Sequence, residues 1–437
     1  MFYPTIMITL FRSIFLLFFS GPSVFDYINH RVHNDINHTK GDIMAYTEYF
    51  APTHVYFGKE TEYLAGKVLK EKGAKKVLLH YGSGSAEKSG LLGIIRKSLE
   101  ENGIKFIELG GVRPNPRLTL ARKGIEICKK EKIDFILAVG GGSVLDSAKC
   151  IGYGTPYDGD VWDFYCGKVV PQKRLPMGAV LTLSATGSEM SNSSVITNDE
   201  IYPNDKFGCN TNLGRPVFAL LNPELTYSVS KYQTGSGSTD IMMHTIERFF
   251  HNGPELDFTD QIAASLLKTV IKNTEIALEK PDDYDARANL MWAGSLSHNG
   301  LTNMGFESGG DWACHRLEHE LSAIYDVAHG AGLSAIWSSW ARYVKTTNPS
   351  RFAKLGKLVF GIEDKDADKA ADKTIDTFEK TFAGFGMPIR ISGLGIDATD
   401  DVCRMLAEKA SLKGAKTLGN FRILETEDMY RIFKAAR

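Results

Sequence analysis

The sequence predicts an α/β domain followed by an all-helical domain, and three features of the chain lead to this expectation. From residue 75 on, short apolar runs that end in glycine alternate with segments of helical periodicity, as they do in βαβ units. After residue 226 the periodicity is helical, with almost no runs of β-branched residues. A length of 437 residues is enough for two domains with cores of their own. We expect the first domain to span 44–225 and the second 226–437, with a cleft between them.

The expected strands of the first domain are short apolar runs, and the first three are followed by glycine. Runs of this kind are typical of buried parallel strands, which helices connect through right-handed crossovers. The pattern therefore predicts a Rossmann-like domain of the type that binds dinucleotides. The expected strands are 76–81, 105–109, 135–139, 178–183 and 217–221, and the helices between the first three are 87–102 and 117–131.

The second domain is expected to be a set of helices that shares a large interface with the first. The chain has no internal repeat and no flexible linker that would separate the two domains. The expected helices of the second domain are 257–279, 284–302, 350–360, 366–385 and 398–411.

Charge and cysteine content restrict the partners and the compartment of the protein. The chain has 51 basic and 52 acidic side chains, and this balance gives no electrostatic reason to bind nucleic acid or an anionic membrane. The six cysteines are dispersed and form no CxxC pair, which argues against a disulfide framework and against a zinc site made of cysteines. We therefore expect a cytoplasmic protein whose partner is a small molecule.

Residues 1–43 differ from the rest of the chain. The apolar run 13–19 is shorter than the roughly 20 residues of a transmembrane helix, and no small-residue cleavage motif follows it. The peptide 40–44 can be encoded by a bacterial ribosome-binding sequence just upstream of a start codon. We expect translation to begin at Met44 and 1–43 to be a non-native leader; the alternative is a genuine, poorly ordered extension.

Two glycine-rich stretches follow predicted strands and are candidates for a dinucleotide site. Gly140–Asp146, which contains Gly141, Gly142 and Ser143, opens a helix, where backbone amides and the helix dipole favour a pyrophosphate. The alternative is a tight turn that binds nothing. The second stretch is Gly82, Ser83, Gly84 and Ser85, which is not a complete dinucleotide fingerprint. It lacks the acidic residue that would repel a 2′-phosphate, which leaves room for NADP(H).

An aspartate and several histidines have the spacing of metal ligands. Asp240 and His244 lie four residues apart, as do His315 and His319, so each pair shares one face of a helix; His329 lies fourteen residues after His315. A carboxylate with imidazoles suits Fe²⁺ or Zn²⁺. An isolated Asp/His pair is often a solvated helix face or a cap, but helix packing requires no such double set. His251 and His298 have no partner at ligand spacing, and we interpret them as structural or exposed.

Taken together, these motifs resemble the iron-containing (group III) alcohol dehydrogenase family, in particular its butanol dehydrogenase and NADPH-dependent aldehyde reductase branch. The likeness extends from Met44 to Arg437. The stretches that carry it are 81–85, 114–116, 140–146, 181–189, 240–244, 286–293 and 315–330.

The resemblance implies a fold like that of dehydroquinate synthase and a role for each matching residue. It implies that Asp240, His244, His315 and His329 bind the metal and that His319 takes part in proton transfer beside it. It also implies cofactor contacts by Gly82, Ser83, Gly84, Ser85, Asn115, Gly141, Gly142, Ser143, Asp146, Thr182, Thr186 and Lys206. Gly82 stands where NAD-preferring relatives carry an aspartate, so the resemblance favours NADP(H), with NAD(H) possible. Ser83 departs from the usual Gly-Gly-Gly-Ser of the branch.

The activity implied by the resemblance is metal-dependent transfer of hydride between NAD(P)H and a short to medium aliphatic aldehyde or alcohol, in a homodimer or larger oligomer. A glycerol dehydrogenase-like enzyme is an alternative, although His244 as a fourth ligand favours the iron type. A dehydroquinate synthase-like lyase would need a basic pocket for a phosphate-bearing acid, and we find no Lys/Arg set near the metal motifs. A dinucleotide-binding protein without turnover would lose the metal ligands. We expect the depth of the substrate pocket to depend on side chains near Trp162, Phe249 and Trp312.

Overall fold

The computed structural model describes residues 47–306 and 308–437. The predicted leader 1–43 lies outside the described residues. The described residues belong to one compact unit, so the boundary between 225 and 226 stays a prediction. Among the described helices, none is long and apolar enough to cross a membrane.

The centre of the first half is a parallel sheet of six strands in the order β1-β8-β5-β4-β2-β3. An antiparallel pair, β6 and β7, forms a second, smaller sheet. The strands are β1 His54–Phe57, β2 Lys76–Gly82, β3 Lys105–Val112, β4 Phe135–Gly140, β5 Met177–Leu181, β6 Ser193–Asn198, β7 Asp205–Asn210 and β8 Phe218–Leu221.

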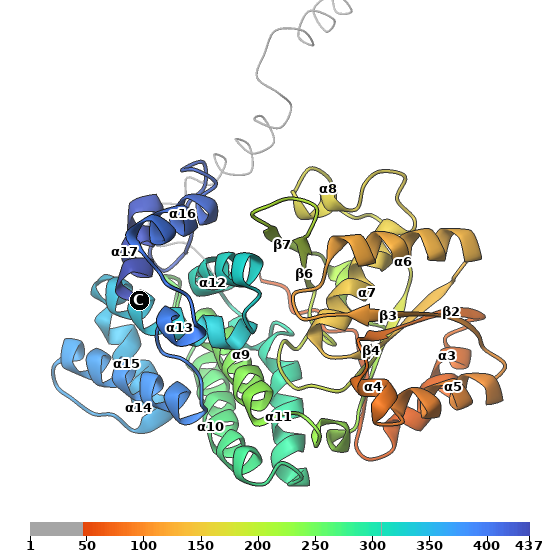
Figure 1. Ribbon diagram of the computed structural model, residues 1–437. Coiled ribbons are helices and arrows are strands. Elements are labelled where there is room, and N and C mark those ends of the chain that lie inside the picture. The colour runs from red at the N-terminus through yellow and green to blue at the C-terminus, as the bar shows by residue number, and fades with distance from the viewer. Residues whose placement is uncertain (1–46, 307) are drawn as a thin grey trace, which may run out of the picture. The chain divides into compact units, whose positions relative to one another are not determined.

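Helices cover both faces of the large sheet (Figure 1). Alternate side chains of β2 and β4 point to opposite faces: Leu78 and Ile136 pack toward α6 and α7, and Leu79 and Leu137 pack toward α3 and α5. The helices of this half are α3 Ala65–Glu71, α4 Ser85–Lys88, α5 Leu91–Glu101, α6 Leu118–Glu131, α7 Gly142–Gly154 and α8 Trp162–Tyr165.

The predicted strands of this half are confirmed, and the structure adds three that the sequence analysis missed. β1 has only four residues and lies at the edge of the sheet, where its side chains are exposed or half-buried. It therefore differs from the longer, fully buried strands that the apolar runs predict. The pair β6–β7 is rich in Ser, Asn and Asp, which weakens its strand pattern. The predicted helix 87–102 is interrupted between α4 and α5, where Gly90 has a φ of +81° directly before Leu91.

The second half of the described chain is helical, as predicted. The predicted helix 284–302 is shorter in the structure and ends at Ser297, since Gly300 adopts a φ of +100°. The helices are α9 Lys231–Phe249, α10 Asp257–Glu279, α11 Tyr284–Ser297, α12 Ala313–Tyr325, α13 His329–Val344, α14 Pro349–Phe360, α15 Ala367–Gly384, α16 Asp400–Ala410 and α17 Thr426–Ala435. A parallel sheet with helices on both faces, followed by helices, confirms the predicted fold class.

Helix α9 runs through the centre of the helical half and positions the candidate site. Its residues from Thr234 to Phe249 are all buried. Small residues let neighbouring segments approach it closely: a Cβ on Gly330, at the start of α13, would lie 1.9 Å from the carbonyl oxygen of Ser236. The carbonyl oxygen of Ser184 lies 2.4 Å from the position of a Cβ on Gly237. The spacing of α9 and α13 therefore depends on glycine.

Replacing Gly330 by Ala is expected to destabilise the protein by about 1–3 kcal/mol, the usual cost of forcing extra atoms into a packed core. Backbone must move in this variant, because the obstructing atom belongs to the main chain of α9. Gly93→Ala is the control: it lies within α5, where a Cβ meets nothing within 4 Å, and Ala stabilises a helix relative to Gly. Urea unfolding of both variants measures the difference, and equal stabilities would contradict the close packing of α9 and α13.

Candidate metal and nucleotide site

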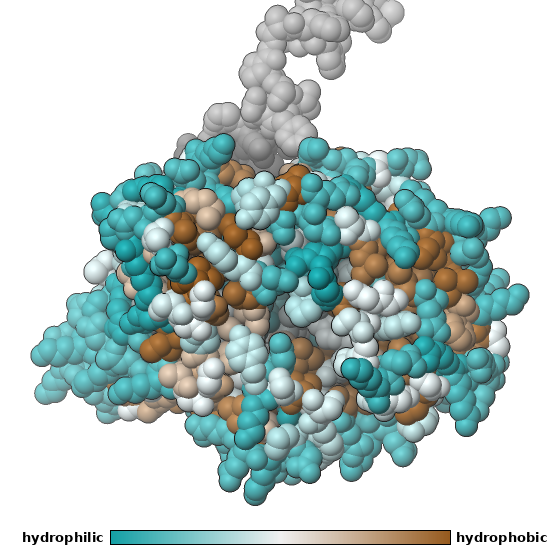
Figure 2. Space-filling view, in the orientation of Figure 1, coloured by the Kyte–Doolittle hydropathy of each residue, from teal (hydrophilic) through white to brown (hydrophobic). Residues whose placement is uncertain are grey.

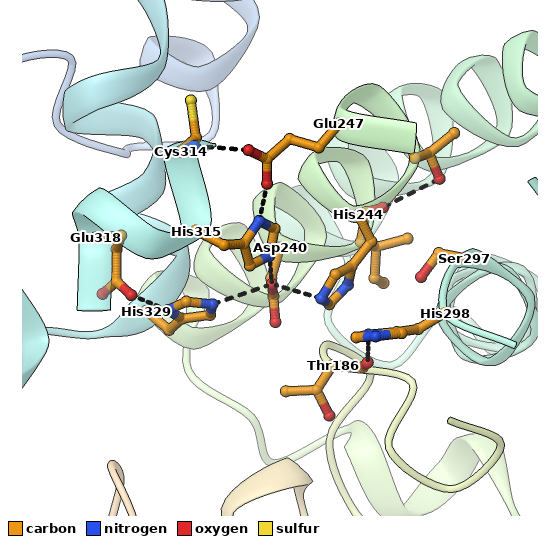
Figure 3. A network of polar contacts seen from close by, with 12 residues as sticks. Thr186, Asp240, His244, Glu247, Ser297, His298, Cys314, His315, Glu318 and His329 are labelled. Carbon is orange, nitrogen blue, oxygen red and sulfur yellow. Dashed lines mark hydrogen bonds and ion pairs between the residues drawn. The ribbon is translucent and has the colours of Figure 1, made fainter. Parts of the chain in front are cut away.

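Three imidazoles point at one carboxylate oxygen in the helical half (Figure 3). Asp240 and His244 lie on α9, His315 on α12, and His329 at the first residue of α13. Asp240 Oδ1 lies 3.6 Å from Nε2 of His244 and 3.7 Å from Nε2 of both His315 and His329. The structure therefore brings together the four predicted metal ligands from three helices.

The donor set fits one divalent cation. The N···O distances of 3.6–3.7 Å are too long for hydrogen bonds, and among the described residues Asp240 Oδ1 and His315 Nε2 are buried without a hydrogen-bond partner. Donor atoms of Asp240, His315 and His329 all lie within 4.8 Å of one another, as ligands of a shared ion would. His244 falls outside that mutual limit, but its Nε2 is the nitrogen nearest to Asp240 Oδ1. One carboxylate with three imidazoles suits Fe²⁺ or Zn²⁺.

Two buried glutamates hold the imidazoles in place, and the sequence analysis missed both. Glu247 accepts hydrogen bonds from Nδ1 of His315 and, at 2.7 Å, from the backbone N–H of Cys314. Glu318 accepts from Nδ1 of His329. These contacts leave Nε2 of each imidazole free for a metal, which is the usual arrangement around ligating histidines. Glu247 follows His244 by three residues, and this spacing was the only signal in the sequence.

The charges around the site shift the pKa values of its histidines in different directions. Burial alone would lower the pKa of His315, but Glu247 and Asp240 raise it to about 9. Burial, reinforced by the neighbouring imidazoles and Arg248, lowers the pKa of His244 well below its usual value. Burial opposes ionisation of Glu318, yet His329 and Lys206 lower the pKa of this carboxyl.

We predict that the affinity of the metal-free protein for a divalent ion rises with pH up to about 9. Below that pH His315 carries a second proton, and a metal must displace it to reach Nε2. Calorimetric titration with Zn²⁺ at pH 7, in buffers of different ionisation enthalpy, is expected to show release of about one proton per ion. Binding at pH 7 without proton release would contradict the raised pKa.

The predicted pyrophosphate loop lies where β4 leads into α7. A Cβ on Gly142, the first residue of α7, would lie 2.3 Å from Oγ1 of Thr186, so the two predicted contact residues adjoin. Ser143 also faces the cavity described below. Asp146 braces the loop, because its carboxylate accepts from Oγ of Ser188 at 2.7 Å and from the backbone N–H of Val195 at 3.0 Å.

Lys206 connects the sheet half to the metal-ligating helices. Its buried Nζ donates to Oδ1 of Asn115 at 2.9 Å and to Oγ of Ser322 at 2.7 Å, and it lies 3.8 Å from Glu318. Asn115 in turn donates to Asp326 at 2.9 Å. Two residues predicted to contact the cofactor therefore contact each other and the helical half.

A cavity of about 770 Å³ is lined both by the metal ligands and by residues predicted to contact the nucleotide. Figure 2 shows this face of the molecule hollowed near its centre. The volume is within the range of small-molecule and cofactor sites. Of the predicted site residues, those that line the cavity are Asn115, Gly142, Ser143, Asp146, Thr186, Lys206, Asp240, His244, His315, His319 and His329.

The other predicted cofactor residues, Gly82–Ser85, Gly141 and Thr182, are outside the cavity lining in the described part of the chain. They are nevertheless close to it. Gly141 immediately precedes α7, and a Cβ on Gly82 would lie 4.0 Å from Val144 in the first turn of that helix. The end of β2 therefore adjoins the pyrophosphate loop.

Comparison with known proteins identifies the family. Residues 52–223 match the family model described as iron-containing alcohol dehydrogenase, and residues 234–437 match the C-terminal model of the same family. The chain is 42% identical over 389 residues to NADH-dependent butanol dehydrogenase A of Clostridium acetobutylicum, covering 89% of this chain and 98% of that protein. It is 32% identical to the NADPH-dependent aldehyde reductase YqhD of Escherichia coli, covering 88% and 98%.

The chain belongs to the iron-containing alcohol dehydrogenase family. A crystal structure of NADH-dependent butanol dehydrogenase A from Thermotoga maritima superposes on it with a TM-score of 0.86 and 38% identity, over 90% of this chain and 99% of that one. The protein is thus a metal- and nicotinamide-dependent oxidoreductase of the alcohol dehydrogenase and aldehyde reductase type.

Within this alcohol dehydrogenase, two histidines lie beside the ligands. His319 is buried on α12, its ring centroid lies 5.8 Å from that of His329, and its Nδ1 has no hydrogen-bond partner among the described residues. The second is His298, which we interpreted as structural or exposed and which is half-buried in the structure. It lines the cavity, its ring centroid lies 4.0 Å from that of His244, and its Nδ1 contacts the carbonyl oxygen of Thr186 at 3.1 Å. The imidazole that it contacts, that of His244, belongs to another helix, and spacing along the chain cannot reveal such a contact.

The structure corrects one further expectation about the cavity. Basic side chains do lie near the metal motifs, since Arg248, Arg316 and Lys416 all line the cavity. Of the three aromatic residues near which its depth was expected to be decided, Trp312 lines the cavity itself and Phe249 directly follows the lining residue Arg248. Trp162 stacks on Tyr165 and Phe207.

Proposed function

We propose that this alcohol dehydrogenase transfers hydride between NADPH and a short to medium aliphatic aldehyde or alcohol. The observation that carries the proposal is the convergence of Asp240, His244, His315 and His329 at one point of the cavity that also contains the loop at Gly142 and Ser143. The relatives named for butanol and for aldehydes support this substrate class.

Each residue has a defined task in the proposed reaction. The four ligands would hold Fe²⁺ or Zn²⁺, which supplies Lewis-acid polarisation of the substrate oxygen. Glu247 and Glu318 keep the imidazoles of His315 and His329 oriented. The cofactor would be bound at three places. Gly141, Gly142 and Ser143 would contact its pyrophosphate, and Thr182 and Thr186 its nicotinamide half. Asn115 and Lys206 would lie beside them.

The residues at the end of β2 support a preference for NADPH. The residues there, Gly82–Ser85, are small and carry no carboxylate. The carboxylates of Glu87 and Glu108 share one guanidinium, that of Arg96, which compensates one of their two negative charges. At the strand end itself a 2′-phosphate would meet hydroxyl and amide donors and no carboxylate. Some relatives are named as NADH-dependent and others as NADPH-dependent, so their names do not indicate which nucleotide this enzyme prefers.

The nucleotide proposal is tested by kcat/KM for NADPH and NADH with butanal under anaerobic conditions. We expect NADPH to be favoured by at least about tenfold, the effect of one ion-pair-sized interaction. Gly82→Asp should reverse the preference, because it supplies the missing carboxylate at a position where a Cβ meets no atom closer than 3.6 Å. Ser89→Asp is the matched control, since Ser89 ends α4 and should leave the ratio unchanged. A wild-type preference for NADH would refute the proposal.

His319 is proposed to move the proton that accompanies hydride transfer. It lies one turn after His315 on α12, lines the cavity, and burial lowers its pKa well below the usual value, so it is neutral and able to accept a proton. His319→Ala is expected to lower kcat about 10²- to 10⁴-fold while metal content stays at the wild-type level. Loss of metal in this variant would instead make His319 a ligand.

We also propose a homodimer or larger oligomer that works in the cytoplasm. The edge strand β1 presents exposed Phe57, which packs against the exposed Trp292, and unpaired edge strands with apolar side chains favour association. All six cysteines are free thiols, as a reducing compartment requires. Light scattering on the purified protein tests the oligomer, and a monomeric mass would refute it.

A further inference from the structure

A buried guanidinium lies beside the metal ligands without an assigned task. Arg248 follows His244 by one turn of α9, is 5% exposed and lines the cavity. Its Nη1 donates to the carbonyl oxygen of His244 at 2.9 Å, and its Nε donates to Oδ1 of Asn303 at 3.2 Å. These two contacts fix the direction of the side chain but supply no negative charge.

No described carboxylate is paired with Arg248. The adjacent Glu247 is bound to His315 and to the backbone of Cys314. Asp311 faces the same cavity, but its oxygens accept backbone N–H groups of Ala313, Asn420 and Phe421. Among the described residues Arg248 takes part in no ion pair, and its Nη2 makes no hydrogen bond. A buried charge without a counterion costs free energy.

The ring of Trp312 lies close both to this guanidinium and to two of the metal ligands. Arg248 Cζ lies 4.4 Å from the centroid of the Trp312 ring. The same ring centroid lies 5.2 Å from that of His315 and 6.2 Å from that of His244. A molecule whose oxygen is held at the ligands could therefore reach Arg248 with a short chain that runs along the Trp312 ring.

Besides Arg248 and the ion-paired Lys206, three cations line the cavity: Arg215, Arg316 and Lys416. Arg316 follows the ligand His315, and Lys416 lies on the loop whose residue Asn420 bonds to Asp311. None of the three takes part in an ion pair within the described part of the chain. This part of the cavity therefore carries positive charge that the described protein does not neutralise.

We propose that Arg248 binds an anionic group of the substrate, so that the preferred aldehyde carries a carboxylate a short chain away from its carbonyl. A carboxylate pairs with a guanidinium through two charge-assisted hydrogen bonds, and the buried position of Arg248 strengthens such a pairing. Arg316 and Lys416 would raise the local concentration of such an anion. The hydride chemistry is unchanged, and this inference rests on the proposed function.

The test compares two aldehydes of equal chain length, butanal and 4-oxobutanoate, with the metal-loaded enzyme. We expect wild type to favour 4-oxobutanoate in kcat/KM by at least tenfold. In Arg248→Gln that preference should fall about 10- to 100-fold, the effect of losing one charged hydrogen-bonded contact. Lys416→Gln removes an exposed charge that folding does not require, and should reduce the preference by less. Lys357→Gln, an exposed lysine on α14 that pairs with Glu363, is the matched control.

The outcomes separate this inference from the function on which it rests. If butanal is reduced but 4-oxobutanoate is not preferred, the anion site is refuted and the reductase activity stands. If the preference exists but survives Arg248→Gln in a folded, metal-loaded variant, Arg248 is not the anion-binding residue. If neither aldehyde is reduced although metal and nucleotide are bound, the proposed function itself fails.

Discussion

Replacing Asp240 by Asn is expected to remove the metal from the enzyme and to lower kcat/KM for butanal by at least about 10³-fold. The metal contributes several kcal/mol to the transition state, and each 1.36 kcal/mol corresponds to a factor of ten. Asp240 Oδ1 is the atom toward which three imidazole nitrogens point, and Asn replaces the carboxylate by a neutral amide of the same shape. Metal analysis and steady-state kinetics on the purified variant measure both effects.

Two controls show that the effect of Asp240→Asn is local. Nucleotide binding, followed by fluorescence, should persist, because Gly142 and Thr186 adjoin each other without help from the metal ligands. Asp376→Asn changes an exposed carboxylate on α15 that pairs with Arg342, and should leave metal content and activity as they are. An Asp240→Asn enzyme with a full complement of metal would contradict the assignment of this ligand.

The second large effect concerns Glu247. Glu247→Ala is expected to weaken divalent metal binding about 10- to 100-fold, as is usual when the partner of a ligating histidine is lost. The substitution leaves His315 Nδ1 and the backbone N–H of Cys314 without their acceptor in a buried place. It also removes the negative charge that raises the pKa of His315. Metal titration of the apo-variant measures the loss.

Glu247→Gln separates orientation from charge. Gln keeps one oxygen acceptor, so we expect an affinity between those of wild type and Glu247→Ala. Glu318→Ala should weaken metal binding to a similar extent as Glu247→Ala. Glu318 accepts a hydrogen bond from Nδ1 of His329, just as Glu247 does from Nδ1 of His315. If Glu247→Ala bound metal as tightly as wild type, the buried carboxylate would have no part in holding the ligand.

Much of the metal site could be predicted because helical spacing is local. Asp240 and His244, four residues apart, necessarily share a face of α9, and His315 and His319 likewise share a face of α12. The strands β2 and β4 were predictable for a similar reason, since the central residues of both are buried and, apart from His80, apolar. In these cases the sequence pattern and the tertiary environment agree.

The residues that were missed depend on contacts between segments distant in the chain. His298 has no partner along its own helix, yet it packs on His244 from α9. Glu247 belongs to α9 but serves His315 of α12, and Arg248 faces Trp312 rather than a carboxylate. A buried charge without a counterion cannot be distinguished from a solvated one until the fold is known. The same limit explains why the cationic part of the cavity was missed.

The most direct test of this account is an anaerobic titration of the metal-free enzyme with Fe²⁺, repeated with Zn²⁺, in which NADPH-dependent reduction of butanal and bound metal are measured in the same sample. We expect activity to appear only with metal and to rise until one ion is bound per chain, because Asp240, His244, His315 and His329 surround one point. Full activity in protein shown to be free of metal, or no activity with the site filled and NADPH bound, would contradict the account.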